Sequence, residues 1–230
     1  MGNAEENLGI IIQARMGSSR LPGKVLKKIG DKSLLEHIFF CLSLLRHPAK
    51  IILATSTHQR DDVIESFCRN RSIEYFRGSE ENVLERYYLC AKKYGFNHIV
   101  RLTADNPFTD MEELDNLIKL HLETGADYSH SFQKLPIGVG AEIFTFDALG
   151  KSFFSGKKEH HKEHVNEYVL ENPELFKISV LSVPPEKNRP DIRLTVDTEE
   201  DYKKACCIIE KSSKECISTV EAIELCLQYA

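Results

Sequence analysis

The sequence predicts an α/β fold built on a mainly parallel sheet. Short apolar runs rich in β-branched residues alternate with stretches of helical periodicity, which is the pattern of strands joined by crossover helices. The first apolar run leads directly into a loop at 13–24 that carries glycine, serine and basic residues. A loop at the carboxyl end of a buried strand is where α/β sheets place their ligands.

The spacing of apolar residues assigns the elements in order. The continuous run Ile10-Ile11-Ile12 is typical of a buried strand, whereas Leu34, Leu35 and Ile38 recur at helical spacing. We expect strands at 8–14, 51–54, 73–76, 97–102, 126–131, 142–146, 176–183 and 192–196. We expect helices at 31–45, 61–70 and 79–94. A further helix is expected to start at 110, another to end near 170, and two more to start at 199 and 219.

The middle of the chain departs from strict alternation. Two predicted strands, at 126–131 and 142–146, flank a glycine-bearing loop with no helix between them, so we expect an antiparallel strand or an inserted subdomain here. No repeat, low-complexity tract or linker interrupts the 230 residues. A single domain covering 1–230 is therefore expected.

The composition limits the function classes. The apolar fraction of 42% and the charged fraction of 28% are those of an ordinary globular protein, and the net charge of −5 argues against a general nucleic-acid binder. No apolar run approaches the ~18 residues of a membrane span, and residues 1–7 are too polar and acidic for a signal peptide. We expect a cytoplasmic protein that neither enters membranes nor binds nucleic acid.

The cysteines carry no recognisable metal or disulfide pattern. Their number is odd and none forms C-x-x-C, so we expect reduced, mostly buried thiols. The seven are Cys41, Cys68, Cys90, Cys206, Cys207, Cys216 and Cys226.

The loop at 13–24, Q-A-R-M-G-S-S-R-L-P-G-K, has the composition of a phosphate site. Arg15, Arg20 and Lys24 supply cations, and the glycines allow backbone N–H groups to approach a ligand. It is not a Walker A motif, because five residues separate Gly17 from Gly23 and Lys24 is followed by valine instead of serine or threonine. The loop alone is also compatible with an ordinary solvated basic turn.

Two carboxylates follow predicted strands elsewhere in the chain. Asp105 lies in R-L-T-A-D-N-P and Asp197 in R-L-T-V-D-T-E-E-D, so both are expected at the same sheet edge as the loop. Mg²⁺ prefers one or two carboxylates together with phosphate oxygens and water. Each aspartate is alternatively a helix N-cap, since acidic residues of a first helical turn follow it.

These motifs together resemble the cytidylyltransferases that make CMP-activated acidic sugars, especially the branch of spore coat polysaccharide biosynthesis protein F. The resemblance rests on the loop at 13–24, F-R-G-S-E-E-N-V-L-E-R-Y-Y at 76–88, R-L-T-A-D-N-P at 101–107, E-H-V-N-E-Y at 163–168 and R-P-D-I-R-L-T-V-D-T-E-E-D at 189–201. It implies a nucleotide-diphospho-sugar transferase fold, a three-layer α/β/α sandwich with a mixed, mostly parallel sheet.

The resemblance also implies roles for individual residues. The nucleotide-binding residues would be Ala14, Arg15, Ser18, Arg20, Lys24, Gly78, Ser79, Asn82 and Ala104. Asp105 and Asp197 would hold Mg²⁺, and with Arg15, Arg20 and Lys24 they would act in catalysis. Glu142, Glu163 and His164 would contact the sugar.

The implied reaction transfers CMP from CTP to a sugar, expected to be a sugar acid, for the biosynthesis of a surface polysaccharide or glycan. A sugar hydroxyl would attack the α-phosphorus and pyrophosphate would leave. Such transfers depend on positioning and charge neutralisation. The family also implies a homodimer, with a region for dimerisation or sugar binding at about 130–175.

Three observations keep alternatives open. His160 and His164 stand four residues apart, but no third ligand is evident and H-E-x-x-H is absent, so zinc is not favoured. A glycosyltransferase of the same fold would normally show D-x-D, where this chain has D-N-P at 105–107. A non-catalytic nucleotide-binding module would leave the paired aspartates unexplained.

Overall fold

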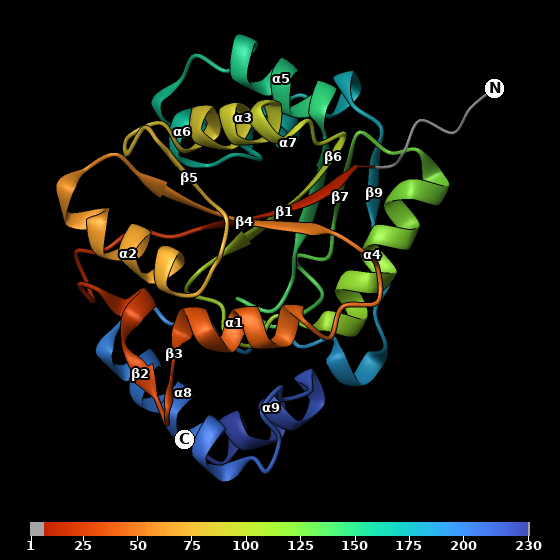
Figure 1. Cartoon of the computed structure of the whole chain (residues 1–230). Coiled ribbons are helices and arrows are strands. Elements are labelled where there is room, and N and C mark those ends of the chain that lie inside the picture. The colour runs from red at the N-terminus through yellow and green to blue at the C-terminus, as the bar shows by residue number, and fades with distance from the viewer. Residues whose placement is uncertain (1–6, 230) are drawn as a thin grey trace.

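A computed structural model describes residues 7–229 and is built around one seven-stranded sheet (Figure 1). The strand order is β5-β4-β1-β6-β8-β7-β9. The strands are β1 (Leu8–Gln13), β4 (Lys50–Ser56), β5 (Tyr75–Gly78), β6 (His98–Thr103), β7 (Tyr128–His130), β8 (Glu142–Thr145) and β9 (Ile178–Val180). Residues 1–6, on which most of the signal-peptide prediction rests, lie outside the described residues.

The sheet is mixed and mostly parallel, as predicted. Strands β5, β4, β1 and β6 are mutually parallel, and β9 is parallel to β7. Strand β8 runs antiparallel to both of its neighbours, β6 and β7. The departure from alternation near 126–146 is therefore an antiparallel strand within the main sheet.

Helices cover both faces of the sheet and complete the predicted α/β/α sandwich (Figure 1). Helices α3, α5, α6 and α7 lie on one side, and α1, α2 and α4 lie on the other, with α8 and α9 beyond α1. Their bounds are α1 (Leu34–Leu42), α2 (Asp62–Asn70), α3 (Val83–Tyr94), α4 (Met111–Thr124), α5 (Phe146–Ser155), α6 (Glu159–Glu163), α7 (Glu167–Glu171), α8 (Glu199–Lys211) and α9 (Thr219–Leu227).

Strand β1 contributes side chains to the apolar core on each face of the sheet. Successive side chains of a strand point to opposite faces, so Ile10 and Ile12 pack with α1, α2 and α4, whereas Ile11 packs with α3 and α5. All three isoleucines are fully buried. This packing fixes the carboxyl end of β1, from which the basic loop begins.

Two predicted elements need correction, and one helix must be added. The run 192–196 forms no strand and makes only one isolated bridge, between Ile137 and Arg193, because its apolar side chains pack against α8 and α9. The start predicted for the first helix is instead a hairpin of β2 (Lys28–Ile29) and β3 (Lys32–Ser33), and α1 begins after it. Helix α5 was not predicted.

The expectation that all seven thiols are reduced is also wrong in this structure. Cys41 of α1 and Cys216, between α8 and α9, form a disulfide with their Cα atoms 5.4 Å apart. Their separation of 175 residues hides this proximity from the sequence. Cys68 and Cys90 are buried thiols, and burial raises the pKa of each to about 12.

Within residues 7–229, no helix combines the length and the apolar character that a membrane crossing requires.

The packing at β1 predicts a specific steric conflict. A Cβ atom added to Gly9 would lie 2.2 Å from the ring of Phe96, which is buried. The variant Gly9→Ala should therefore lose about 1–3 kcal/mol of the free energy of unfolding, the usual cost of overpacking a core. Urea denaturation followed by circular dichroism measures this loss.

The double variant Gly9→Ala/Phe96→Leu provides the control. Removing part of the ring should relieve the clash, so the double variant should be less destabilised than the sum of the two single variants. Strict additivity would contradict this account of the β1 packing.

Candidate active site

The loop after β1 is held in a defined shape by its own backbone. The carbonyl of Met16 accepts hydrogen bonds from the N–H groups of Ser18 and Gly23, each at 3.0 Å. The N–H of Met16 donates to Asp61 Oδ1 at 2.8 Å, and Asp61 is fully buried. Gly23 has a φ of +70°, in the left-handed region that favours glycine. The cations of this loop are thus presented from an ordered turn.

The side chain of Lys24 joins the loop to both predicted metal ligands. Its Nζ atom lies 2.7 Å from Asp105 Oδ2, 2.8 Å from Asp197 Oδ1 and 2.9 Å from the carbonyl oxygen of Val196. The structure therefore brings together residues that are 81 and 173 positions apart in the chain. Both aspartates reach the same sheet edge as the loop, as the sequence predicted.

Asp197 is surrounded by positive charge. Arg20 lies 3.2 Å from its carboxylate, Arg193 also pairs with it, and Asp201 accepts a hydrogen bond from its backbone N–H at 3.1 Å. Burial acts to raise the pKa of Asp197, but the hydrogen bonds from Lys24 and Arg193 and the charge of Arg20 lower it below the ordinary value of 3.8. Asp197 is therefore a carboxylate at neutral pH.

The same atoms suit a divalent cation. Three oxygens, from Asp105, Asp197 and Val196, converge on the single positive charge of Lys24. Oxygen donors of this kind are the ligands that Mg²⁺ prefers. The donor set fits the predicted metal, provided that Lys24 turns toward another anion when the metal is bound.

A cavity of about 200 Å³ opens at this point. Eight of the residues predicted to bind the nucleotide or the metal line it. They come from the loop, from the end of β6 and from the end of the 192–196 run: Ala14, Arg15, Ser18, Arg20, Lys24, Ala104, Asp105 and Asp197. Its remaining lining comes from Gln13, Gly17, Ser19, Val25, Arg86 and Thr103.

The block at 76–88 contributes to the cavity in a way the sequence did not predict. Ser79 Oγ accepts from the N–H of Asn82, and Asn82 Oδ1 accepts from the N–H of Glu85, so these side chains shape the start of α3. Gly78, Ser79 and Asn82 do not line the cavity. Arg86, one turn after the Asn82 cap, lines it instead.

A charged residue on the buried face of α3 was the signal for Arg86. Its neighbours Leu84, Tyr87 and Cys90 are all buried, so helical spacing alone would place Arg86 inside the molecule. The other missed lining residues, such as Gln13 and Thr103, stand at strand ends and carry no distinguishing pattern.

The three predicted sugar contacts separate in the structure. Glu142 is fully buried, pairs with Arg101 at 2.5 Å and accepts a hydrogen bond from Tyr128. This burial argues against direct contact with a sugar, because a carboxylate inside the sheet layer is already occupied by its partners. Glu163 is exposed and lies 3.9 Å from Arg15, at the margin of the site, and His164 is exposed as well.

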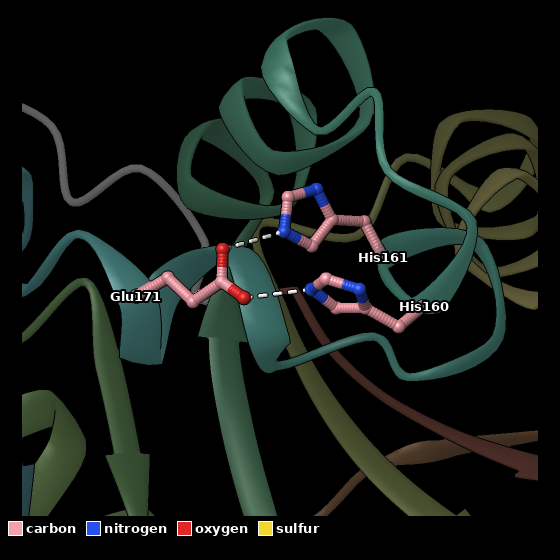
Figure 2. A group of neighbouring side chains, drawn as sticks. All are labelled: His160, His161 and Glu171. Carbon is pink, nitrogen blue, oxygen red and sulfur yellow. Dashed lines mark hydrogen bonds and ion pairs between the residues drawn. The ribbon is translucent and has the colours of Figure 1, made fainter.

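The histidines of α6 bind a carboxylate that the sequence had not connected with them. Nε2 of His160 lies 2.6 Å from Glu171 Oε1, and Nε2 of His161 lies 3.0 Å from Oε2 (Figure 2). Lys158 Nζ approaches the same Oε2 at 2.7 Å. Lys158 supplies a positive charge to Glu171, and the cluster links α6 to α7. The ligand atoms of His160, His161 and Glu171 lie within 4.8 Å of one another, so Glu171 is a third potential metal ligand that the sequence did not show.

Comparison with known proteins identifies the family of this chain. A family model described as cytidylyltransferase matches residues 9–224. The chain is 36% identical over 209 residues to the spore coat polysaccharide biosynthesis protein SpsF of Bacillus subtilis, covering 89% of this chain and 87% of that protein.

Solved structures give the same result. A cytidylyltransferase from Leptospira borgpetersenii superposes with a TM-score of 0.90 at 32% identity, covering 97% of this chain and 94% of the other. A CMP:2-keto-3-deoxy-manno-octonic acid synthetase complexed with CTP superposes with a TM-score of 0.66 at 15% identity, covering 89% and 99%, and shows the shared fold. The family model and the relatives match nearly the whole length of the chain, which therefore belongs to the cytidylyltransferase family.

Proposed function

We propose that the protein transfers CMP from CTP to a hydroxyl of a sugar acid, with Mg²⁺ as cofactor and pyrophosphate as the leaving product. The observation that carries this proposal is the meeting of Lys24 with Asp105 and Asp197. A phosphate-binding loop and a pair of metal-binding carboxylates then occupy one cavity. The sugar-acid substrate is supported by the names of relatives, which include cytidylyltransferases for 3-deoxy-manno-octulosonate at 26–29% identity over about half of this chain.

The residues of the loop would act on the triphosphate. Arg20 and Lys24 would face the β- and γ-phosphates and stabilise the charge that grows on pyrophosphate as it leaves. Lys24 would exchange its two carboxylate partners for phosphate oxygens when the nucleotide binds. Ser18 and the backbone of the ordered turn would fix the orientation of the phosphates.

The carboxylates would organise the reacting centre. Asp105 and Asp197 would hold the Mg²⁺ ion, whose chemistry is to neutralise phosphate charge. The attacking hydroxyl oxygen would form a bond to the α-phosphorus while the bond between that phosphorus and the bridging oxygen breaks. Pyrophosphate would leave with the bonding electron pair, and the hydroxyl proton would pass to solvent. The catalytic contribution is then alignment and charge neutralisation, as in other phosphoryl transfers.

The acceptor would enter from the side of α6. Arg15 of the loop lines the cavity and lies 3.9 Å from Glu163, and both side chains are exposed. An exposed arginine at this point suits the carboxylate of a sugar acid, because guanidinium and carboxylate form paired hydrogen bonds.

A substrate screen tests the proposed reaction. CTP, UTP, GTP and ATP are each incubated with Mg²⁺ and a panel of sugar acids, and pyrophosphate release is measured. We expect release with CTP and at least one acid, and its loss with a chelator. Turnover with UTP alone, or no release across a broad panel, would contradict the proposal. Binding of CTP without turnover would indicate a non-catalytic module, and consumption of a preformed nucleotide sugar would indicate a glycosyltransferase.

The two aspartates provide a second test. Asp105→Asn and Asp197→Asn keep the side-chain volume but remove the charge, so each should lower the rate of pyrophosphate release by about a hundredfold or more. Half-maximal activity should require more Mg²⁺. The matched control is Asp191→Asn, because Asp191 is exposed and pairs only with the neighbouring Arg189 among the described residues. Wild-type rates in both site variants would remove the metal assignment.

We also propose that the 130–175 stretch forms a dimer interface. Phe154, Leu170 and Leu175 in this stretch are 61%, 46% and 44% exposed, which is costly for large apolar side chains in water.

Sedimentation velocity tests this interface. The wild-type protein should sediment with the mass of two chains, and the double variant Leu170→Lys/Leu175→Lys with the mass of one. Val63→Lys, which changes an apolar residue on α2 that is 44% exposed, should leave the mass unchanged. A monomeric wild-type protein would refute the interface.

A further inference from the structure

Two neighbouring histidines of α6 direct ring nitrogens at one carboxylate of α7. Nε2 of His160 lies 2.6 Å from Oε1 of Glu171, and Nε2 of His161 lies 3.0 Å from Oε2 (Figure 2). One ligand atom from each of the three side chains lies within 4.8 Å of the other two. Imidazole nitrogen and carboxylate oxygen are both ligands of Zn²⁺, whereas Mg²⁺ prefers oxygen alone. The donor set is therefore that of a zinc site.

Packing holds one member of this group in place. His161 is 3% exposed, and its ring meets the ring of Tyr168 edge-on, with centroids 5.5 Å apart. A Cβ atom on Gly156 would lie 3.1 Å from Nδ1 of His161, so glycine leaves the room that the ring occupies. The side chains of His160 and Glu171 are 42% and 33% exposed. The group thus combines a preorganised ligand, which lowers the entropic cost of binding, with two ligands that an ion can reach from solvent.

Only small movements separate the observed cluster from one that holds an ion. Zinc bonds to nitrogen and oxygen of about 2.0–2.2 Å place the ligand atoms of a tetrahedral site roughly 3.4 Å apart. The two nitrogen–oxygen distances would therefore grow by less than about 1 Å. The backbone N–H of Lys158 now donates to Nδ1 of His161 across 3.4 Å. That long contact would be given up, because a neutral imidazole that binds metal through Nε2 carries its proton on Nδ1.

Lys158 is the group that competes with an ion. Its Nζ atom lies 2.7 Å from Glu171 Oε2, and its side chain is 62% exposed. An ion pair at the surface contributes little to stability, so Lys158 can return to water at little cost. A divalent cation brings twice the charge of an ammonium group to the carboxylate, which favours the exchange.

We propose that His160, His161 and Glu171 bind one Zn²⁺ ion, with water as the fourth ligand. The ion would join α6 to α7, two helices of five residues each, which are too short to be stable in isolation. None of the three ligands lines the cavity after β1. The zinc site is therefore separate from the aspartates proposed to hold Mg²⁺, and it does not depend on the proposed reaction.

Titration calorimetry with Zn²⁺ tests this site, in excess Mg²⁺ to occupy the aspartate pair. We expect the wild-type protein to bind Zn²⁺ and both His161→Gln and Glu171→Gln to lose that binding. Changes to residues that only support metal ligands commonly cost about ten- to a hundredfold in affinity, so removing a ligand should cost about a hundredfold or more. The matched control is His164→Gln, because His164 caps the same helix outside the cluster and should leave the affinity unchanged.

The variant Lys158→Met distinguishes a metal site from a network of ion pairs. Methionine keeps most of the apolar stem and removes the charge that competes for Glu171, so the affinity for Zn²⁺ should rise about tenfold. Lys162→Met is its control, because Lys162 of the same helix pairs with Glu159 at 2.6 Å and should leave the affinity near the wild-type value. Weaker binding in Lys158→Met would contradict the proposed competition.

Cobalt substitution identifies the ligands in the wild-type protein. Tetrahedral Co²⁺ with nitrogen and oxygen ligands gives visible d–d absorption, and a thiolate ligand would add a charge-transfer band in the near ultraviolet. We expect the visible bands without the thiolate band. Zn²⁺ should abolish them by displacement, because such sites generally bind Zn²⁺ more tightly than Co²⁺.

Other results would overturn the assignment. Equal Zn²⁺ affinity in the wild-type protein and Glu171→Gln would show that the cluster is an ion-pair network only. A loss in His164→Gln as large as that in His161→Gln would assign the metal to a different set of histidines. Should the ligand variants fail to fold, a wild-type Co²⁺ spectrum without tetrahedral bands, or with the thiolate band, overturns the zinc site.

Discussion

The ammonium group of Lys24, bound between two carboxylates, is the interaction on which the site depends. Its side chain is only 10% exposed, and a cation so placed is stable only with partners, because removing one member of a buried ion pair leaves an uncompensated charge. The pairing of Lys24 with both carboxylates brings together three segments that are distant in sequence: the loop after β1, the end of β6 and the run before α8. The groups that we propose to act in catalysis are thus brought together by charge pairing at a sheet edge that apolar packing has already fixed.

The buried charges of this protein divide into two kinds. Arg101 and Glu142 pair with each other inside the sheet layer, and Nη2 of Arg101 lies 3.3 Å from Gln13, a cavity residue. That pair is an ion pair within the protein and holds the wall of the cavity, although Nε of Arg101 has no hydrogen-bond partner among the described residues. Arg86 is the contrasting kind, because its protein partner is a single carbonyl. Burial lowers the pKa of Arg86, as do the nearby charges of Arg15 and Arg101, although Tyr87 and Asp61 act in the opposite direction.

Local periodicity predicted much of the fold and the loop half of the site. Ile10 to Ile12 and the polar residues after them are a local pattern, and the structure places them as expected. The 192–196 run shows the limit of prediction from local periodicity. Its alternating apolar residues predict an extended chain, but they pack against α8 and α9, and the run joins no sheet. Helix α5 was not predicted, and it contains Gly150, a residue of low helix propensity. A Cβ atom added to Gly150 would lie 3.5 Å from the ring of Tyr88. The burial of Glu142 and the Cys41–Cys216 disulfide depend on tertiary contacts that no spacing reveals.

The distance in sequence between Lys24 and Asp197 has a consequence for biosynthesis. The two residues are 173 positions apart, which at ~5–20 residues per second corresponds to roughly 10–35 s of translation. During that interval the nascent chain can pair Lys24 with Asp105 but not with Asp197. The proposed catalytic centre therefore cannot be completed until Asp197 has left the ribosome. A chain truncated before Asp197 would carry the basic loop but only one of the two carboxylates proposed to hold Mg²⁺.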